Sequence, residues 1–186
     1  LSQGSQLFLS EHAVVSDNVA AYGDGGGVQV NGPQSYLEIS GRARVLHNVA
    51  VRGHGGGVHA TDNATVGLFQ AALLEKNFAM ASDARGGGIG LDRGSHLGLQ
   101  NESAVRNNTC RGFGGGIAGS YSSTVLLTDD SSLQGNQARV AGGGMHLQHG
   151  ASSVFQARAF VKACASSGQG GGIVLLSAAL TLSDTT

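Results

Sequence analysis

Gly55-Gly56-Gly57-Val58 is one of six copies of a motif in which three glycines precede an apolar residue. The copies begin at Gly25, Gly55, Gly86, Gly114, Gly142 and Gly170, so they are 30, 31, 28, 28 and 28 residues apart. Self-similarity at a fixed period of this length is typical of repeat architectures. Every residue can therefore be compared with its counterparts in the other repeats, and such a set of counterparts is called a column below.

Two kinds of column accompany the glycines. The first is an asparagine upstream of each triplet, replaced by Cys164 in the sixth repeat: Asn18, Asn48, Asn77, Asn108 and Asn136. The second consists of apolar residues that alternate with polar ones, such as Leu7/Leu9, Leu37/Ile39, Val66/Leu68, Leu97/Leu99 and Val125/Leu127. Alternation of period two indicates half-buried strands, and no apolar stripe of helical period persists along the chain.

The repeat length and the alternation together predict an all-β fold. Three short strands in each unit of 28–31 residues suit one coil of a parallel β-helix, whose inward residues stack on their counterparts about 4.8 Å away. We therefore predict a right-handed parallel β-helix of about six coils, with right-handedness taken from the usual crossover of parallel strands. A β-propeller needs about four strands per blade and aromatic signatures, whereas aromatic residues make up 5% of this chain. Residues 1–186 are expected to form a single β-helix section, uncapped at both ends, from a longer repeat protein.

Composition bears on partners and location. Charged residues make up 12% of the chain and the net charge is −1, with no basic or acidic block. The sequence therefore lacks the electrostatic signature of a nucleic-acid-binding protein or of one that binds anionic membranes. No stretch resembles a signal peptide or a membrane span, so direct membrane insertion by this segment is not expected.

The glycines and asparagines are interpreted as structural. Glycine alone freely adopts positive φ and lets another backbone approach closely, which predicts a glycine corner in every coil that neighbouring coils, or neighbouring rods, can contact. Phosphate binding would require a following helix, and a strand-like segment follows instead. The asparagines are expected to form a ladder of stacked amides. The glycine corner comprises Gly25, Gly26, Gly27, Gly55, Gly56, Gly57, Gly86, Gly87, Gly88, Gly114, Gly115, Gly116, Gly142, Gly143, Gly144, Gly170, Gly171 and Gly172.

Candidate catalytic and metal-binding side chains do not cluster in the columns. A zinc site needs three or four converging ligands, yet of the seven histidines only His59 and His146 share a column, three repeats apart. We therefore interpret the histidines as surface imidazoles. The adjacent pair Asp129-Asp130 is expected in a turn, because successive strand residues face opposite sides. No catalytic residue, metal ion or cofactor is predicted, and the chain is not expected to be an enzyme.

The two cysteines are not expected to pair with each other. Cys110 lies in the fourth repeat and Cys164 in the sixth, so two coils, or roughly 9 to 10 Å, separate them along the axis. A disulfide requires Cα atoms within about 7 Å.

Three segments match the acceptor pattern for N-glycosylation. Their asparagines are Asn63, Asn101 and Asn107, each followed two residues later by Thr65, Ser103 or Thr109. Asn63 lies between two predicted strands and is expected to be exposed. Chance matches to so short a motif are the alternative.

The paired motifs resemble the repeat of polymorphic outer membrane proteins. That family carries Phe-x-x-Asn and Gly-Gly-Ala-[Ile/Leu/Val] in β-helical surface passengers that act in adhesion. Matching segments here include Val15-Ser16-Asp17-Asn18, Val45-Leu46-His47-Asn48 and Leu133-Gln134-Gly135-Asn136. Two departures are that Val or Leu replaces the Phe, and that a third Gly replaces the Ala throughout. The resemblance implies a β-helical surface protein, and extracellular protein fibres of algae and protists are a related expectation.

These observations favour a non-catalytic extracellular rod, structural or adhesive, within a cell-surface fibre or filament. Its expected partners are other copies, other proteins of a surface assembly, and glycans, but not nucleic acid. The alternatives are a carbohydrate-active enzyme on the same fold, either a polysaccharide lyase or a glycoside hydrolase, and a flat strand face that binds glycans or ice. A regular Thr ladder would favour ice, and the outward columns show none.

Overall fold

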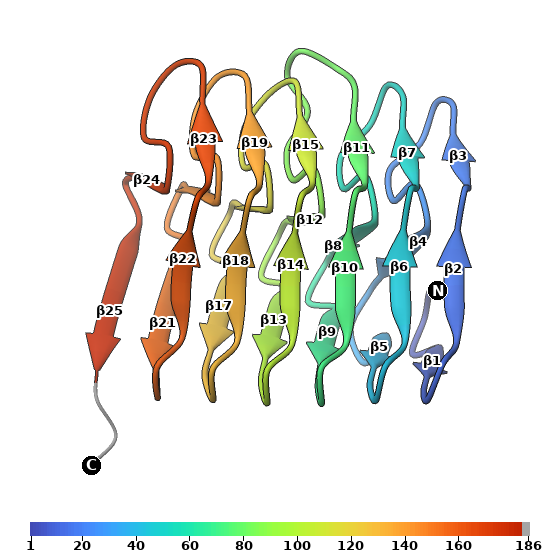
Figure 1. The fold of residues 1–186 in the computed structure, drawn as a ribbon. Coiled ribbons are helices and arrows are strands. Elements are labelled where there is room, and N and C mark those ends of the chain that lie inside the picture. Colours follow the sequence, from blue (N-terminus) through green and yellow to red (C-terminus); the bar gives the residue numbers. More distant parts are fainter. Residues whose placement is uncertain (184–186) are drawn as a thin grey trace.

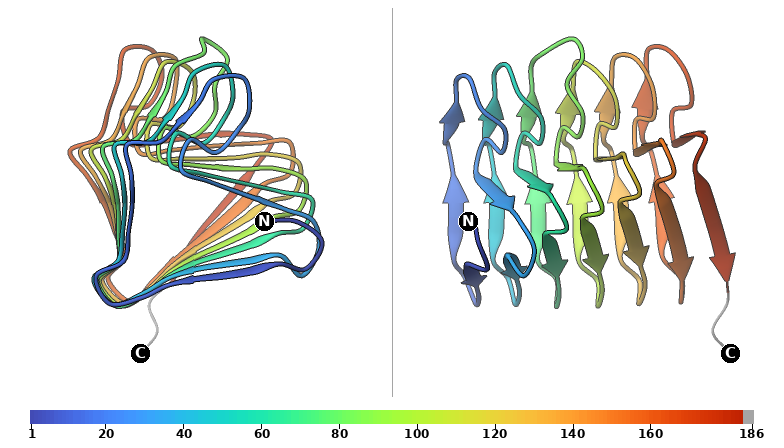
Figure 2. Two further views of the ribbon diagram at one scale, coloured as in Figure 1. Left: turned by 90° about the vertical axis from the view of Figure 1, so that its right-hand side faces the viewer. Right: turned by 180° about the vertical axis from the view of Figure 1, so that it is seen from behind.

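The molecule is a solenoid of stacked parallel strands. The computed structural model describes residues 1–183, and within them it contains strands and no helix (Figure 1). Each strand pairs in parallel with its counterpart one coil away. Seen from the N-terminal end, the chain turns clockwise as the coils recede from the viewer (Figure 2), so the solenoid is right-handed. The predicted parallel β-helix of about six coils is confirmed, while residues 184–186 of the predicted section lie outside the described residues.

Four sheets run along the solenoid and are numbered here in chain order. Sheet 1 consists of β1 (Gln6–Leu9), β5 (Tyr36–Ile39), β9 (Thr65–Leu68), β13 (His96–Leu99), β17 (Thr124–Leu127), β21 (Ser152–Gln156) and β25 (Ala179–Ser183). Sheet 2 consists of β2 (Val14–Ser16), β6 (Arg44–Leu46), β10 (Leu73–Glu75), β14 (Ala104–Arg106), β18 (Ser132–Gln134) and β22 (Phe160–Lys162). Sheet 3 consists of β3 (Val19–Ala20), β7 (Val49–Ala50), β11 (Phe78–Ala79), β15 (Thr109–Cys110), β19 (Gln137–Ala138) and β23 (Ala165–Ser166). Sheet 4 consists of β4 (Val28–Asn31), β8 (Val58–Thr61), β12 (Ile89–Leu91), β16 (Ile117–Gly119), β20 (Met145–Gln148) and β24 (Ile173–Leu176).

The structure has four strands per coil where the alternation predicts three. The additional strands are those of sheet 3, which are two residues long and therefore too short to display alternation. They are separated from sheet 2 by a residue of positive φ and the column asparagine. The positive-φ residues are Asp17, His47, Lys76, Asn107, Gly135 and Ala163, with φ between 53° and 60°. Because most of these residues are not glycine, the bend could not be predicted from the sequence.

The interior is filled by the apolar residues that alternate along the strands. Leu37, Ile39, Leu68 and Leu74 are fully buried. Each stacks on its counterpart in the next coil, as in the pairing of Leu37 with Val66. A single cluster of apolar side chains runs through the coils. Burial of this continuous core, rather than of any one coil, is what stabilises such a repeat.

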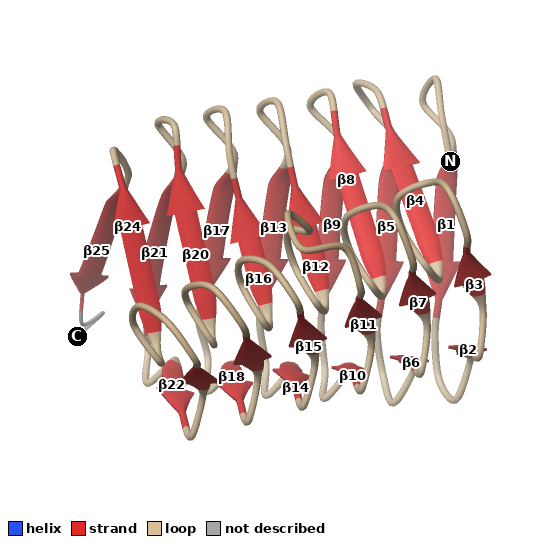
Figure 3. Ribbon diagram, turned by 90° about the horizontal axis from the view of Figure 1, so that it is seen from above, coloured by secondary structure: helices blue, strands red, loops and turns tan. Residues whose placement is uncertain are grey.

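A loop joins sheet 3 to sheet 4 in each coil and bulges from the rod (Figure 3). Under these loops lies a second, small apolar cluster of Ala79, Ala84 and Cys110. The glycine triplets close the loops and lead directly into the strands of sheet 4. Among the described residues there is no helix with the length and apolar character needed to span a bilayer.

Candidate functional site

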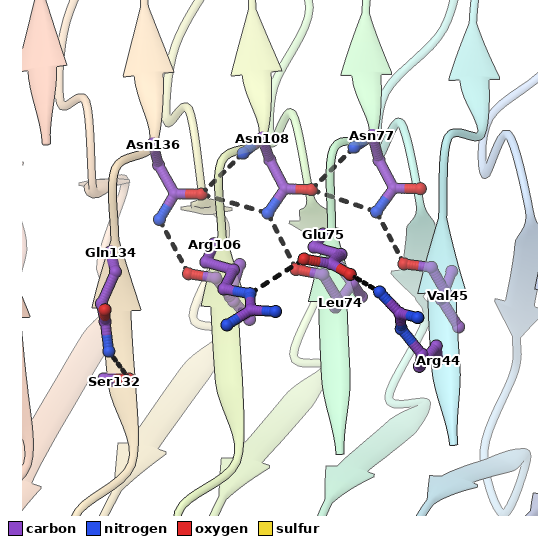
Figure 4. A network of polar contacts seen from close by, with 11 residues as sticks. Arg44, Val45, Leu74, Glu75, Asn77, Arg106, Asn108, Ser132, Gln134 and Asn136 are labelled. Carbon is purple, nitrogen blue, oxygen red and sulfur yellow. Dashed lines mark hydrogen bonds and ion pairs between the residues drawn. The ribbon is translucent and has the colours of Figure 1, made fainter. Parts of the chain in front are cut away.

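Four column asparagines are buried inside the solenoid and are hydrogen-bonded in series: Asn48, Asn77, Asn108 and Asn136 (the last three in Figure 4). The series continues to Asn18 of the first coil, which is exposed. The side-chain amide of Asn77 donates to Oδ1 of Asn108 at 3.0 Å and to the carbonyl of Val45 at 3.0 Å. Its own Oδ1 accepts from the backbone N–H and the side-chain amide of Asn48, at 3.0 and 3.1 Å. All four hydrogen-bonding positions of this buried side chain are therefore occupied. The same pattern recurs at Asn48 and Asn108.

The two cysteines are free thiols in different surroundings. Cys110 is buried below the loop, where its thiol donates to the carbonyl of Ala84 at 3.3 Å, and burial raises its pKa to about 12. Cys164 occupies the sixth position of the asparagine column, 3.9 Å from the side-chain amide of Asn136. Burial also raises the pKa of Cys164. Both thiols are therefore held in the protonated, unreactive form.

The glycine triplets face inward, against the asparagine ladder and the adjacent coil. The first glycine of each triplet has positive φ, as in Gly55 at 62°. A Cβ on the second, Gly56, would overlap backbone atoms of Phe78 and Gly87. A Cβ on the third, Gly57, would lie 2.9 Å from the amide carbon of Asn77. Glycine is thus required because the loop, the ladder and the next coil meet at this corner.

This arrangement corrects one expectation drawn from the sequence. The triplets beginning at Gly55, Gly86, Gly114 and Gly142 are buried throughout. They present no glycine edge against which a neighbouring rod could pack. The close approach that the glycines permit is between coils of the same chain.

The three glycosylation sequons lie at exposed turns. Asn63 is between sheets 4 and 1, Asn101 between sheets 1 and 2, and Asn107 between sheets 2 and 3. All three asparagines are exposed and have positive φ, at 62°, 51° and 54°. The hydroxyl residues of the sequons are less accessible: Thr65 and Thr109 are half-buried, and Ser103 is buried. The asparagine side chains themselves are open to solvent.

Two histidines are buried, which contradicts their interpretation as surface imidazoles. His59 and His146 point outward from sheet 4, but the bulging loop covers this part of the sheet, and they are only 4% and 1% exposed. Neither ring nitrogen of His146 has a hydrogen-bond partner, and its ring lies 4.9 Å from that of Phe113. Burial, and secondarily the charge of Arg85, lowers the pKa of His146. Both imidazoles are therefore neutral at pH 7.

Polar groups lie close to the other buried histidine, His59. Nδ1 of His59 lies 3.7 Å from a carboxylate oxygen of Asp24, and Asp24 accepts from the backbone N–H of His54 at 2.7 Å. The pKa of His59 is lowered by burial, which outweighs the opposing effect of the Asp24 charge. Across residues 1–183, no three side chains of His, Cys, Asp or Glu converge in a way that could hold a metal ion.

The acidic pair Asp129-Asp130 lies in a turn, as predicted, with φ of 52° and 60°. The carboxylate of Asp130 accepts two hydrogen bonds from the guanidinium of Arg158, at 2.8 and 2.6 Å. These hydrogen bonds lower the pKa of Asp130. Asp130 therefore links two adjacent coils through Arg158 at the surface of the molecule.

The cationic residues gather on one side of the solenoid. This side, called here the sheet 2–3 face, comprises the strands of sheets 2 and 3 and the residues within two positions of them. In Figure 1 the strands of sheet 3 continue directly above those of sheet 2. Nine of the eleven Lys and Arg residues belong to it: Arg42, Arg44, Arg52, Lys76, Arg106, Arg111, Arg139, Arg158 and Lys162. Four acids accompany them, namely Asp17, Glu75, Glu102 and Asp130.

The charges of this chain are thus segregated. The sheet 2–3 face has a surplus of five positive charges, from nine cations and four acids. The remaining two cations and eight acids of the sequence give a surplus of six negative charges. The strands of sheet 1, by contrast, contain Glu38 as their single acid and no Lys or Arg in the described residues. The near-neutral total conceals this division, because the repeat period brings distant residues to one face.

An ion triplet organises the centre of the cationic face (Figure 4). Glu75 of β10 lies between Arg44 of β6 and Arg106 of β14, and it forms ion pairs with both. Burial alone would raise the pKa of Glu75, but the hydrogen bonds from the two arginines outweigh that effect and lower it. The carboxylate is therefore held charged, and the three side chains cross-link three successive coils.

Comparison of the chain with protein-family models, with curated proteins and with solved structures gives no match. Its membership of the parallel β-solenoids therefore rests on its own architecture, with several parallel sheets stacked over about six coils. The function must be inferred from the surfaces and columns of this chain.

Proposed function

We propose that this chain is a non-catalytic section of an extracellular β-helical rod with a structural or adhesive role in a cell-surface fibre or filament. The proposal rests on what the residues of the repeated motif contact. The asparagine side chains and the glycines of each coil contact one another and the next coil inside the rod. The residues that define the repeat therefore serve to stack coils. A stacked array extends in length simply by repetition.

The outer surface also suits a role in contact with other molecules. Seven strands of sheet 1 give a section about 29 Å long at the usual strand spacing. Along it, the cationic sheet 2–3 face and the described strands of sheet 1, whose single charged residue is Glu38, offer two chemically different surfaces. The resemblance of the repeat to polymorphic outer membrane proteins supports an adhesin-type function. Exposed Asn63, Asn101 and Asn107 would carry N-linked glycans if the chain passes through a secretory pathway.

Location and catalysis can be tested together. An antibody raised against residues 1–183 should label intact source cells without permeabilisation. The purified chain, incubated with neutral and acidic polysaccharides, should release no new reducing ends or unsaturated sugars. Labelling that appears only after permeabilisation would contradict an extracellular rod. Release of cleavage products would instead establish the alternative, a carbohydrate-active enzyme on this fold.

A further inference from the structure

A shallow groove crosses the outward side of sheet 2. It is lined by His12, Arg42, Arg44, Ala71, Leu73 and Arg106. These residues come from four consecutive coils, so the groove follows the axis of the solenoid. Its lining combines cationic groups with the small apolar surfaces of Ala71 and Leu73. We refer to it as the sheet 2 groove.

The arginines of the sheet 2 groove remain accessible to a ligand. Arg42 is exposed and forms no ion pair within residues 1–183. Arg44 and Arg106 both contact Glu75, yet their side chains are 43% and 39% exposed while Glu75 is 3% exposed. The single carboxylate is therefore enclosed between two guanidinium groups that still present donors to solvent. Arg44 and Arg106 share the single charge of Glu75, and Arg42 has no acidic partner among the described residues, so two of the three positive charges are uncompensated.

The arrangement of these charges restricts the class of ligand. Arginine presents a planar set of donors that matches carboxylate and sulfate oxygens in pairs. Arg44 and Arg106 are two coils apart, or about 10 Å at the usual strand spacing. A linear polymer with acidic groups spaced along it can contact both while its sugar rings lie over Ala71 and Leu73. A closed pocket for a single small molecule is not what this open, axial groove resembles.

Charge density argues against nucleic acid as the occupant. Duplex DNA carries one charge per roughly 1.7 Å of its axis, so a length of 10 Å presents about six phosphates. The groove sets three arginines and one buried glutamate against that length. A more sparsely charged chain fits better.

We propose that the sheet 2 groove binds an acidic polysaccharide, with Arg42, Arg44 and Arg106 contacting its carboxylate or sulfate groups. This deepens the proposed adhesive function and rests on it. Arg42 supplies a contact that serves no structural ion pair, whereas Arg44 and Arg106 each serve both the ligand and Glu75. In the free chain Glu75 is paired with Arg44 and Arg106, and it therefore competes with the ligand for both guanidinium groups.

The test measures binding of the chain to labelled dextran sulfate and alginate by fluorescence anisotropy, at about 50 and about 200 mM salt. At least one of the two should bind, more weakly at the higher salt concentration, and neutral dextran should not. The pair distinguishes sulfate from carboxylate recognition. Arg42→Gln should weaken binding about three- to tenfold. The matched control is Arg93→Gln, a change at a 66% exposed arginine outside the sheet 2–3 face, and it should leave affinity unchanged.

A second variant separates ligand contact from structural support. Glu75→Gln removes the competing carboxylate, so affinity should rise about threefold if the arginines bind the ligand. A purely structural role for the triplet would lower affinity or leave it unchanged. Circular dichroism of each variant checks that the fold is retained.

Four results would overturn the proposal: binding of neither acidic polysaccharide, equal effects of Arg42→Gln and Arg93→Gln, equal binding of neutral dextran, or tighter binding of duplex DNA or polyglutamate than of either acidic polysaccharide. If such a result came with surface labelling of intact cells, it would refute ligand binding by the sheet 2 groove and would still agree with the proposed rod function.

Discussion

At the scale of single residues, the second glycine of a triplet is packed against the backbone of the next coil, as Gly87 shows. A Cβ on Gly87 would overlap the carbonyl oxygens of Thr109 and Gly115, both of which are backbone atoms of the next coil. Backbone cannot move aside as the end of a flexible side chain can, so relief would require the coils to separate. Gly98, on the outward side of sheet 1, has no atom within 4 Å of the place where a Cβ would be.

This contrast gives the first stability prediction. Gly87→Ala should lower the free energy of unfolding by about 3 kcal/mol, because the added methyl overpacks the contact between coils. The same substitution at Gly98 adds the methyl into open space and removes a flexible residue from a strand. It should be neutral or stabilising by about 0.5 kcal/mol. Urea unfolding of both variants checks the pair, and equal effects would show that the contact between coils is not what demands glycine.

At the scale of elements, the covering loop changes what sheet 4 can expose. The outward column of this sheet contains His59 and His146 and, one coil beyond His146, Val174. Without the loop these side chains would be solvated, as alternation along a strand predicts. With it, the imidazole of His146 is enclosed with both nitrogens unpartnered, and its charged form is penalised.

A pH dependence of stability follows from this burial. The folded state lowers the pKa of His146 below 6.5, so as the pH falls through about 6.5 the unfolded chain binds a proton that the folded chain does not. Stability should therefore decrease toward acid pH, by up to about 1.4 kcal/mol per pH unit from this group. His146→Val, which copies Val174 of the next coil, should lose less stability between pH 7.5 and pH 5. Urea unfolding at both pH values measures this loss. If His146→Val lost as much stability as the parent chain, His146 would not be the source of the pH dependence.

The elements differ in how well they could be predicted from the sequence. The inward pairs such as Leu37/Ile39 could be predicted because their alternation repeats in every coil. Sheet 3 could not, because two residues carry no period, and the bend before it uses residues as different as Asp17 and Lys76 at positive φ. The burial of His59 and His146 was hidden for another reason. Whether a loop folds back over a strand depends on tertiary packing, which no column of residues records.

At the scale of the whole molecule, each coil contacts only its neighbours, so stability is a sum over coils and interfaces. Every sheet continues through the same register from one coil to the next. The asparagine ladder continues in the same way. A coil is therefore an exchangeable unit, provided that removal preserves the column positions.

Deletion of residues 86–113 removes one complete period of 28 residues and places Asn136 directly after Asn77 in the ladder. The shortened chain should fold with an unchanged β-sheet signal by circular dichroism and a smaller hydrodynamic radius. Deletion of residues 86–99, half a period, is the matched control. It sets the glycine corner that begins at Gly55 against the turn at residues 100–102, and this chain should be protease-sensitive. Equal protease resistance of the two chains would contradict the register argument.

The distribution of charge over the faces of the molecule could not be predicted from the composition and net charge. A net charge of −1 suggested no charged surface. Arg106 is far from Arg42 and Arg44 in the sequence, and it joins them only because the repeat period returns it to sheet 2. Once the columns are aligned to the sheets, residues such as Glu75 can be assigned to the same face as the arginines on either side. The columns already contained these charged residues. Their common face could be recognised only once the structure showed which strand positions point outward.

The asparagine ladder also gives the solenoid an electrical direction. Oδ1 of each internal asparagine accepts from the coil before it, while its Nδ2 donates to the asparagine of the coil after it. The amide dipoles are consequently aligned along the axis and polarise one another, with their positive ends toward the later coils. A second array carrying the same ladder could continue it only head to tail, since two ladders meeting with like ends would place oxygen against oxygen or N–H against N–H. The direction in which the chain is read thus sets the sign of a dipole that runs through the interior of the rod.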